Sequence, residues 1–427
     1  MLIEFSVENY RSINGKQTLS METASIKEFP ENIIGNDKYK LLSSTAVYGA
    51  NSSGKSNFIR AMNIMRHFVQ ENFEKSSVNR LPHDPYLLNT LSADKSSHFE
   101  ILFLIENIRY RYGFEINKKK VVSEWLFEMK KNTEKPLFIR VEDGIEVMPD
   151  FKEGKGMEER TRDNALFLSV VDQFNGKTAN KIIKWFKNFN IISGLNHEDY
   201  RGITFSMLEA PETYEILKKY YQQIDLGFED ITILKKELTE DDLPNDIPED
   251  IMKQLFSDLK GKTAISMKTM HKLFNETGEQ TGLTEFDVRR QESSGTNKII
   301  DLSGPIFNTF KEGGILVVDE LDAKLHPLLT LSIIRLFQNR ILNKNNAQLI
   351  FATHDSNLLS LARFRRDQIY FIEKDKFGAS QLYSLVEYKQ EKVRNDRSFE
   401  KDYLNGRYGA IPYLENINKL ENKWQEK

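Results

Sequence analysis

The sequence contains no cysteine, which excludes disulfide bonds and metal sites built on thiolates. It has only seven histidines, and none of them forms a pair at the spacing typical of zinc ligands. Any metal ion in this protein is therefore expected to be one that accompanies a nucleotide.

Long apolar runs are also missing. No segment approaches the ~18 uninterrupted apolar residues of a membrane-spanning helix, and the mean hydropathy is -0.52. The first residues alternate between apolar and polar and lack the basic start and apolar block of a signal peptide. We therefore expect a cytoplasmic protein without a membrane partner. Because 60 basic residues face 63 acidic ones, no overall positive charge indicates nucleic-acid binding.

A glycine-rich loop follows a predicted buried strand at residues 44–48 and precedes a predicted amphipathic helix. In such a P-loop, successive backbone N–H groups surround the phosphates, Lys55 reaches the terminal phosphates and the Ser56 hydroxyl ligates Mg²⁺. The alternative, a chance loop of glycine and serine, does not explain the strand before it and the helix after it. ATP and Mg²⁺ are the predicted cofactors. The predicted nucleotide-binding residues are Gly49, Ala50, Asn51, Ser52, Ser53, Gly54, Lys55, Ser56 and Asn57.

Two adjacent acids end another predicted buried strand, at residues 315–318. Asp319 can hold Mg²⁺ directly or through water, and Glu320 can polarise the attacking water. Two acids can also merely begin a solvated loop, but the presence of a P-loop favours the catalytic interpretation. His354 ends the strand expected to lie beside this one, where it can hydrogen-bond a γ-phosphate oxygen or the attacking water. Glu320, His354 and Lys55 are the predicted catalytic residues for ATP hydrolysis.

The order of predicted elements indicates an α/β protein in which one domain interrupts another. At 427 residues the chain exceeds what one hydrophobic core usually serves. Residues 1–160 combine the P-loop with strands that predict an antiparallel β meander, and residues 281–427 alternate strands and helices as a mainly parallel sheet does. Residues 161–280 predict a mostly helical inserted lobe. We therefore expect a P-loop NTPase domain split by this lobe, with a short tail.

The chain contains, in this order, the motifs Asn9-Tyr10-Arg11-Ser12, the P-loop, Ser293-Ser294-Gly295-Thr296, Asp319-Glu320, Asp322 and His354. This ordered set resembles the motifs of the ABC-type ATPases. Within them it is similar to the RecF-, SMC- and OLD-related branch, and more narrowly to the stand-alone anti-phage defence ATPases of the RloA type and to the ATPases of PARIS-type systems. The motifs lie at both ends of the chain, and the middle lobe resembles no family.

This resemblance implies an ABC-type fold and a homodimer, or a higher homo-oligomer, formed through the ATPase heads. In such a dimer, ATP on the P-loop of one subunit is closed over by the signature loop of the other. Ser293 and Gly295, with Ser294 and Thr296 in the same loop, would face the partner's γ-phosphate. By residue pattern alone, this hydroxyl-rich loop predicts only a helix N-cap.

Three further roles are implied by the resemblance. Asp322 would be the D-loop acid that contacts the partner, His354 would be the switch histidine, and Arg11 matches an early basic residue that approaches the nucleotide. Two positions depart from the usual signature, because Glu292 stands where leucine is common and Ser294 replaces a glycine.

OLD-type nucleases carry a further nuclease domain after the ATPase. Only about 70 residues follow His354 here, fewer than such a domain needs, so no nuclease domain is expected in this chain.

Three functions fit these features. The leading hypothesis is a sensor or regulatory ATPase of a bacterial abortive-infection defence system that controls a separately encoded toxin or nuclease. The alternatives are a RecF-like DNA-repair or chromosome-maintenance ATPase that binds duplex DNA, and a nucleotide-gated scaffold with very slow turnover. For nucleic acid, the candidate surface is the basic cluster at residues 363–366, which can also be a solvated loop.

Overall fold

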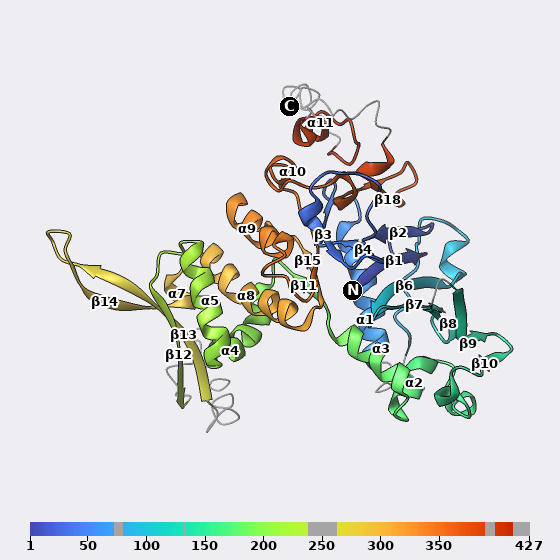
Figure 1. Cartoon of the computed structure of the whole chain (residues 1–427). Coiled ribbons are helices and arrows are strands. Elements are labelled where there is room, and N and C mark those ends of the chain that lie inside the picture. Colours follow the sequence, from blue (N-terminus) through green and yellow to red (C-terminus); the bar gives the residue numbers. More distant parts are fainter. Residues whose placement is uncertain (72–79, 131–132, 238–262, 389–397, 413–427) are drawn as a thin grey trace, which may run out of the picture. The chain divides into compact units, whose positions relative to one another are not determined.

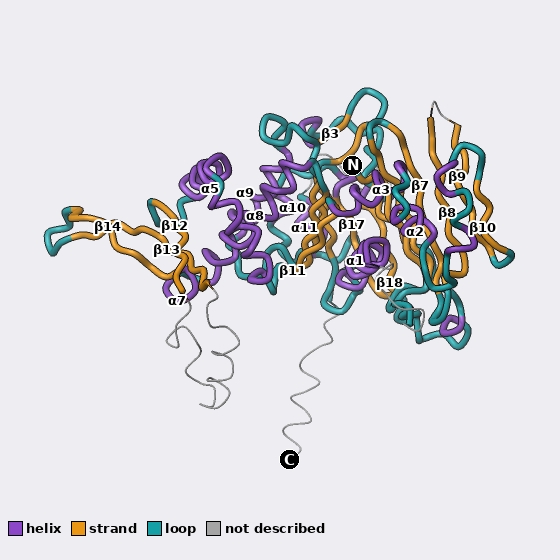
Figure 2. The backbone as a smooth tube through the Cα atoms, turned by 90° about the horizontal axis from the view of Figure 1, so that it is seen from below, coloured by secondary structure: helices purple, strands orange, loops and turns teal. Residues whose placement is uncertain are grey.

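The computed structural model describes residues 1–71, 80–130, 133–237, 263–388 and 398–412 (Figures 1 and 2). The chain forms two compact units. The first comprises Met1–Leu195, Asn308–Ala323 and Pro327–Lys427, and the second comprises Asn196–Phe307 and Lys324–His326. Among the described helices, none has the length and apolar character required to cross a membrane.

One sheet of the first unit is antiparallel and has the strand order β10-β9-β8-β7-β6-β1-β2. Long strands joined by short turns make it a meander, as the sequence predicted, with β1 and β2 added at one side. Its strands are β1 (Leu2–Glu8), β2 (Gln17–Ser20), β6 (Ser97–Ile105), β7 (Ile108–Ile116), β8 (Val121–Lys130), β9 (Thr133–Val141) and β10 (Gly144–Val147).

The other large sheet is mainly parallel and has the order β11-β15-β16-β5-β17-β18, in which only β18 runs antiparallel to its neighbour. Its central strands β5, β15 and β16 are almost wholly buried, as expected for a sheet covered on both faces. The strands of this sheet are β5 (Ser44–Tyr48), β11 (Phe189–Ser193), β15 (Ile315–Asp319), β16 (Gln348–Ala352), β17 (Ile369–Lys374) and β18 (Ser380–Ser384). The structure adds β11 to this sheet, although its residues lie in the range expected for the inserted lobe.

Two helices lie between the sheets of the first unit. α1 (Lys55–Glu71) and α3 (Lys177–Lys187) each contact strands of both sheets, and their apolar side chains share one core with them. The rings of Phe103 and Trp185 stack there, with their centroids 4.4 Å apart. Because side chains alternate along a strand, Val47 faces this core while Tyr48 faces the other side, where it contacts Tyr403.

The far face of the parallel sheet is covered by α9 (Pro327–Gln338) and, after β18, by residues 398–412. Tyr403 and Tyr408 of this segment are buried and stack on Phe371. The remaining helices of the first unit are α2 (Phe167–Gln173), α10 (Leu358–Leu361) and α11 (Phe399–Leu404). A hairpin of β3 (Ile33–Gly35) and β4 (Lys40–Leu42), which the sequence analysis missed, precedes β5.

In its described residues, the second unit combines helices with a three-stranded antiparallel sheet. Residues 238–262, which fall in the range expected for the mostly helical lobe, lie outside the described residues. The helices of this unit are α4 (Arg201–Glu209), α5 (Pro211–Gln223), α7 (Val288–Gln291) and most of α8 (Ser294–Glu312), and its strands are β12 (Asp230–Glu237), β13 (Thr263–Phe274) and β14 (Gln280–Asp287). At its centre, the buried carboxylate of Asp301 accepts hydrogen bonds from His197 at 2.7 Å and Arg201 at 2.6 Å. This ion cluster ties α8 to α4.

The basic cluster at residues 363–366 does not form the nucleic-acid surface considered above. Arg365 is fully buried, and its guanidinium donates to Asp367 and to backbone carbonyls of residues 24–28. Arg366 is also buried and pairs with Glu28 at 3.1 Å. Arg363 is exposed, but neither alternative considered above, a nucleic-acid surface or a solvated loop, describes Arg365 and Arg366. Buried arginines that satisfy backbone carbonyls have the same sequence pattern as exposed ones.

Candidate functional site

The P-loop lies at the carboxyl edge of the parallel sheet. β5 leads into residues 49–54, and α1 begins at Lys55. Since β15 and β16 run parallel to β5, Glu320 and His354, which follow them, lie at the same edge. A cavity of about 570 Å³ opens there and is lined by the loop, both of those side chains and Lys374. The structure therefore brings the P-loop together with Glu320 and His354.

Two positions of the loop require glycine because neighbouring atoms lie too close for a side chain. Gly54 has a φ of +117°, and a Cβ there would lie 2.1 Å from Oγ of Ser380. A Cβ on Gly49 would lie 2.4 Å from the carbonyl oxygen of Ile372. The loop can pack directly on β17 and β18 only because both positions lack a side chain.

A small network of hydroxyl groups holds the P-loop against β18 and the N-terminal segment. Oγ of Ser380 lies 2.7 Å from the carbonyl oxygen of Ser53 and 2.8 Å from Oγ of Ser12. The side-chain amide of Asn57 donates to the same Ser12 hydroxyl at 2.9 Å. Asn57 thus lines the cavity and also anchors the N-terminal segment to α1.

Arg11 does not line this cavity. Its guanidinium forms an ion pair with Asp84 at 2.7 Å, and its side chain is about one third exposed. The motif contacts the P-loop through Ser12, while buried Asn9 binds backbone groups of residues 86–96. A role for Arg11 at the nucleotide stays a prediction.

The buried ammonium of Lys55 folds back on its own loop. Nζ donates to the carbonyl oxygens of Gly49 at 2.8 Å and Ala50 at 3.2 Å. Burial removes the ammonium from water and lowers the pKa of Lys55 to about 8, although the charges of Asp319, Glu320 and Asp322 oppose this shift. A bound polyphosphate would supply the negative charge that this lysine lacks at close range.

The oxygens beside Lys55 fit a magnesium ion that arrives with nucleotide. Oδ1 of Asp319 and Oδ1 of Asp322 are buried and have no hydrogen-bond partner among the described residues. Such orphaned carboxylate oxygens are costly unless a cation or water occupies the site. The part of the chain that the structure describes contains no cluster of three histidine or acidic ligands. This donor set suits Mg²⁺, which is usually bound by one or two carboxylates plus phosphates and water.

Glu320 occupies a strained backbone conformation. Its φ is +58°, a left-handed value that costs about 1–2 kcal/mol for a residue with a Cβ. The turn is held by hydrogen bonds from Leu321 N–H to the Ala352 carbonyl at 3.1 Å and from Ala323 N–H to the Glu320 carbonyl at 3.3 Å. Strain that is held in this way is often found at functional positions.

His354 is fixed through its backbone to the same turn, since its N–H donates to Oδ2 of Asp322 at 3.3 Å. Partial burial, and then the positive charge of Lys55, lower the pKa of His354. The imidazole is therefore mainly neutral at neutral pH, with one N–H donor and one acceptor. Asp322 lies in this turn, where the resemblance places the D-loop.

The signature loop belongs to the second unit. Ser293 caps α8, as the residue pattern predicted, because its Oγ accepts the N–H of Thr296 at 3.1 Å. The side chains of Ser293 and Ser294 are exposed, and the backbone N–H groups of Ser294 and Gly295 have no partner among the described residues. Donors exposed at the start of a long helix are suited to binding an anion.

The unusual Glu292 has a structural explanation. Its carboxylate accepts hydrogen bonds from the side chains of Thr269 and His271 on β13. The amide of Asn297 in turn binds the carbonyl oxygens of Glu292 and Ser293. Glutamate at this position thus connects the signature loop to the three-stranded sheet of the second unit.

The sequence analysis missed Lys374 and Ser380. Lys374 ends β17, so it reaches the same sheet edge as the P-loop, and it lines the cavity. β17 lies in residues 281–427, for which alternating strands and helices were predicted, and following this strand to its carboxyl end would have found the lysine. Ser380 carried no signal, because its contact with Gly54 depends on the antiparallel pairing of β18 with β17.

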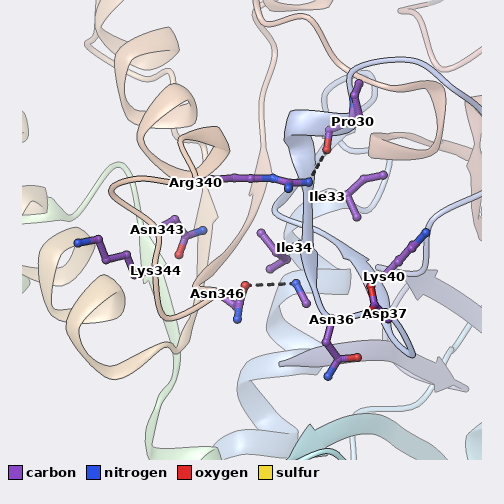
Figure 3. A pocket seen from close by; sticks show the side chains of 11 residues that line it. Pro30, Ile33, Ile34, Asn36, Asp37, Lys40, Arg340, Asn343, Lys344 and Asn346 are labelled. Carbon is purple, nitrogen blue, oxygen red and sulfur yellow. Dashed lines mark hydrogen bonds between the residues drawn. The ribbon is translucent and has the colours of Figure 1, made fainter.

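A second cavity, of about 400 Å³, lies at the opposite edge of the sheet, between the β3–β4 hairpin and the loop after α9 (Figure 3). Arg340 reaches from this loop to the carbonyl oxygen of Pro30 at 2.8 Å. Lys40, Arg340 and Lys344 all line the cavity, and none of them pairs with a carboxylate within the described ranges. Its other charged residue is Asp37.

Comparison with known families agrees with this geometry. Residues 44–360 match the family model described as "AAA domain, putative AbiEii toxin, Type IV TA system". The chain belongs to this family. It is an ATPase of the AAA class, as the motifs predicted, whereas the narrower similarity to RloA-type proteins stays a prediction. No curated protein matches the sequence significantly.

Solved structures give weaker similarities. The SMC head domain from Thermotoga maritima shares 14% identity, with 90% of this chain and 98% of that chain covered and a TM-score of 0.38. A structure of the recombination mediator protein RecF with ATP shares 13% identity, with 83% and 94% covered and a TM-score of 0.29. These scores are too low to support any statement on function.

The depressed pKa of Lys55 predicts a pH dependence of ATP binding. The negative charge of the bound phosphates should raise the pKa of Lys55. ATP binding near pH 8 therefore takes up a proton, and the affinity for ATP falls as the pH rises. Between pH 7 and pH 9 the dissociation constant should increase about tenfold. Calorimetric titration in buffers of different ionisation enthalpy measures both effects.

The matched control is Lys55→Arg, because arginine stays charged throughout this range. Its affinity should change little with pH. An equal loss of affinity in this variant would show that another group causes the pH dependence.

Proposed function

We propose that this AAA-class ATPase is the regulatory subunit of a bacterial abortive-infection system and controls a separately encoded toxin or nuclease. The family match, whose description names the AbiEii toxin and a type IV toxin–antitoxin system, carries the proposal. The P-loop, Glu320 and His354, which line one cavity, support its ATPase part.

The nucleotide site supports hydrolysis of ATP to ADP and phosphate. Lys55 and the loop N–H groups would hold the phosphates, and the Glu320 carboxylate would accept a hydrogen bond from the water that attacks the γ-phosphorus. Neutral His354 would donate to a γ-phosphate oxygen. Ser56 and Asp319 would hold Mg²⁺, which supplies neutralisation of phosphate charge.

We further propose that the site is completed by a second copy of the chain. The exposed hydroxyls of Ser293 and Ser294 and the unpaired N–H groups at the start of α8 would bind the γ-phosphate of the partner. Asp322 would contact that partner through the D-loop. ATP would then control the assembly state, and phosphate release would reverse it.

A second candidate function is binding of duplex DNA in the manner of a repair ATPase. It is favoured by the second cavity, where Lys40, Arg340 and Lys344 have no carboxylate partner in the part of the chain that the structure describes and can bind a phosphate backbone. This cavity replaces residues 363–366 as the candidate nucleic-acid surface.

Replacement of the proposed catalytic carboxylate should stop ATP hydrolysis without weakening ATP binding. Glu320→Gln is expected to retain ATP affinity and lower the hydrolysis rate by about 10²–10⁴-fold, because the amide cannot activate water. Phosphate release and equilibrium binding measure the two effects. Glu312→Gln, an exposed glutamate at the end of α8, is the matched control. An unchanged rate in Glu320→Gln would disprove the assignment.

The defence role is tested in cells challenged with phage. The chain together with the product of the neighbouring reading frame should protect the culture, and Lys55→Ala should abolish protection because the phosphates lose their cation. The chain expressed alone should not arrest growth. Growth arrest by the chain alone would show that it is itself the toxin.

The DNA-binding alternative predicts a salt-dependent affinity that the second cavity controls. The double variant Lys40→Gln/Lys344→Gln should reduce the steepness of log affinity against log salt concentration by about two. Fluorescence anisotropy with labelled duplex between about 50 and 200 mM salt measures this slope. Lys118→Gln/Lys119→Gln removes equal charge from an exposed turn and is the control. Equal binding by both double variants would contradict a role for this cavity.

A further inference from the structure

The peptide between Asp319 and Glu320 is packed directly against the end of the edge strand β11. β11 runs parallel to β15, with Ser193 aligned with Asp319, and the next residue is Gly194. The N–H of Gly194 donates to the carbonyl oxygen of Asp319 at 2.7 Å. The two strands therefore stay hydrogen-bonded up to the point where β15 turns into its catalytic loop.

No side chain fits at Gly194. A Cβ there would lie 2.1 Å from the carbonyl oxygen of Glu320 and 2.9 Å from that of Asp319. Both obstacles are backbone atoms, which cannot rotate away as a flexible side chain can. An alanine could be accommodated only if the Asp319–Glu320 segment moved.

That movement would change the direction of the Glu320 side chain. The backbone of Glu320 is left-handed, with φ of +58°, so its conformation depends on contacts from its surroundings. On the other side, the N–H of Leu321 binds the carbonyl oxygen of Ala352. Gly194 and Ala352 thus hold the turn from opposite sides, and the carboxylate of Glu320 lines the nucleotide cavity.

We propose that Gly194 is a positioning residue for ATP hydrolysis, which aims Glu320 by allowing the end of β11 to lie against its peptide. This inference rests on the proposed role of Glu320. Gly194 does not line the nucleotide cavity, so it acts on the rate of hydrolysis and not on ATP binding.

The test is steady-state hydrolysis and ATP binding by Gly194→Ala in the full chain. We expect kcat to fall at least about tenfold, while KM and the ATP dissociation constant stay within about twofold, because a 1 Å displacement of a catalytic group is costly. Melting temperatures verify that the variants are folded.

The chain offers a matched control in the same pair of strands. Gly314 precedes β15 at its other end, and a Cβ there would lie 2.5 Å from the carbonyl oxygen of Asn188. Gly314→Ala therefore introduces a similar backbone clash far from the turn. It should retain kcat even if it lowers the melting temperature.

A double variant separates positioning from a general loss of structure. If Gly194 acts only through Glu320, Gly194→Ala should not further lower the residual rate of Glu320→Gln. A wild-type kcat in Gly194→Ala, or an equal loss of rate in both backgrounds, would overturn the inference. A wild-type rate in Glu320→Gln would instead overturn the role of Glu320, on which the inference rests.

Discussion

The parallel alignment of β15, β16, β5 and β17 is the constraint on which the nucleotide site depends. Parallel strands end at one edge of a sheet, so residues from distant parts of the sequence meet there without a dedicated scaffold. The P-loop follows β5, the Asp319–Glu320 turn follows β15, and His354 follows β16. The antiparallel sheet and α1 fix this arrangement from one face, and α9 covers the other.

The elements around the P-loop were predictable because their signals are local. A strand, a glycine loop and a helix follow one another directly, and the boundaries of β5 agree with the predicted residues 44–48. Long-range pairing left no such signal. Membership of β11 in the parallel sheet, the contact of Ser380 with Gly54 and the burial of Arg365 all depend on which segments meet in space. Neither the periodicity nor the composition of the sequence specifies these long-range contacts.

The second unit shows how a departure from a sequence motif can have a structural cause. Glu292 replaces an apolar residue, yet it is held by Thr269 and His271 rather than exposed to water. The chain enters this unit at Asn196, two residues after Gly194, which packs on the catalytic turn.

The most direct test of a composite site is activity of a mixed dimer. A Lys55→Ala chain and a Gly295→Asp chain are purified together through two different tags. In this mixed dimer, the intact P-loop of the Gly295→Asp chain can face the intact signature loop of the Lys55→Ala chain. Each variant alone should be inactive, and the mixed dimer should regain about half of the wild-type rate, since one of two equivalent sites is intact. A mixed dimer as inactive as its parents would contradict completion of the site by a second copy.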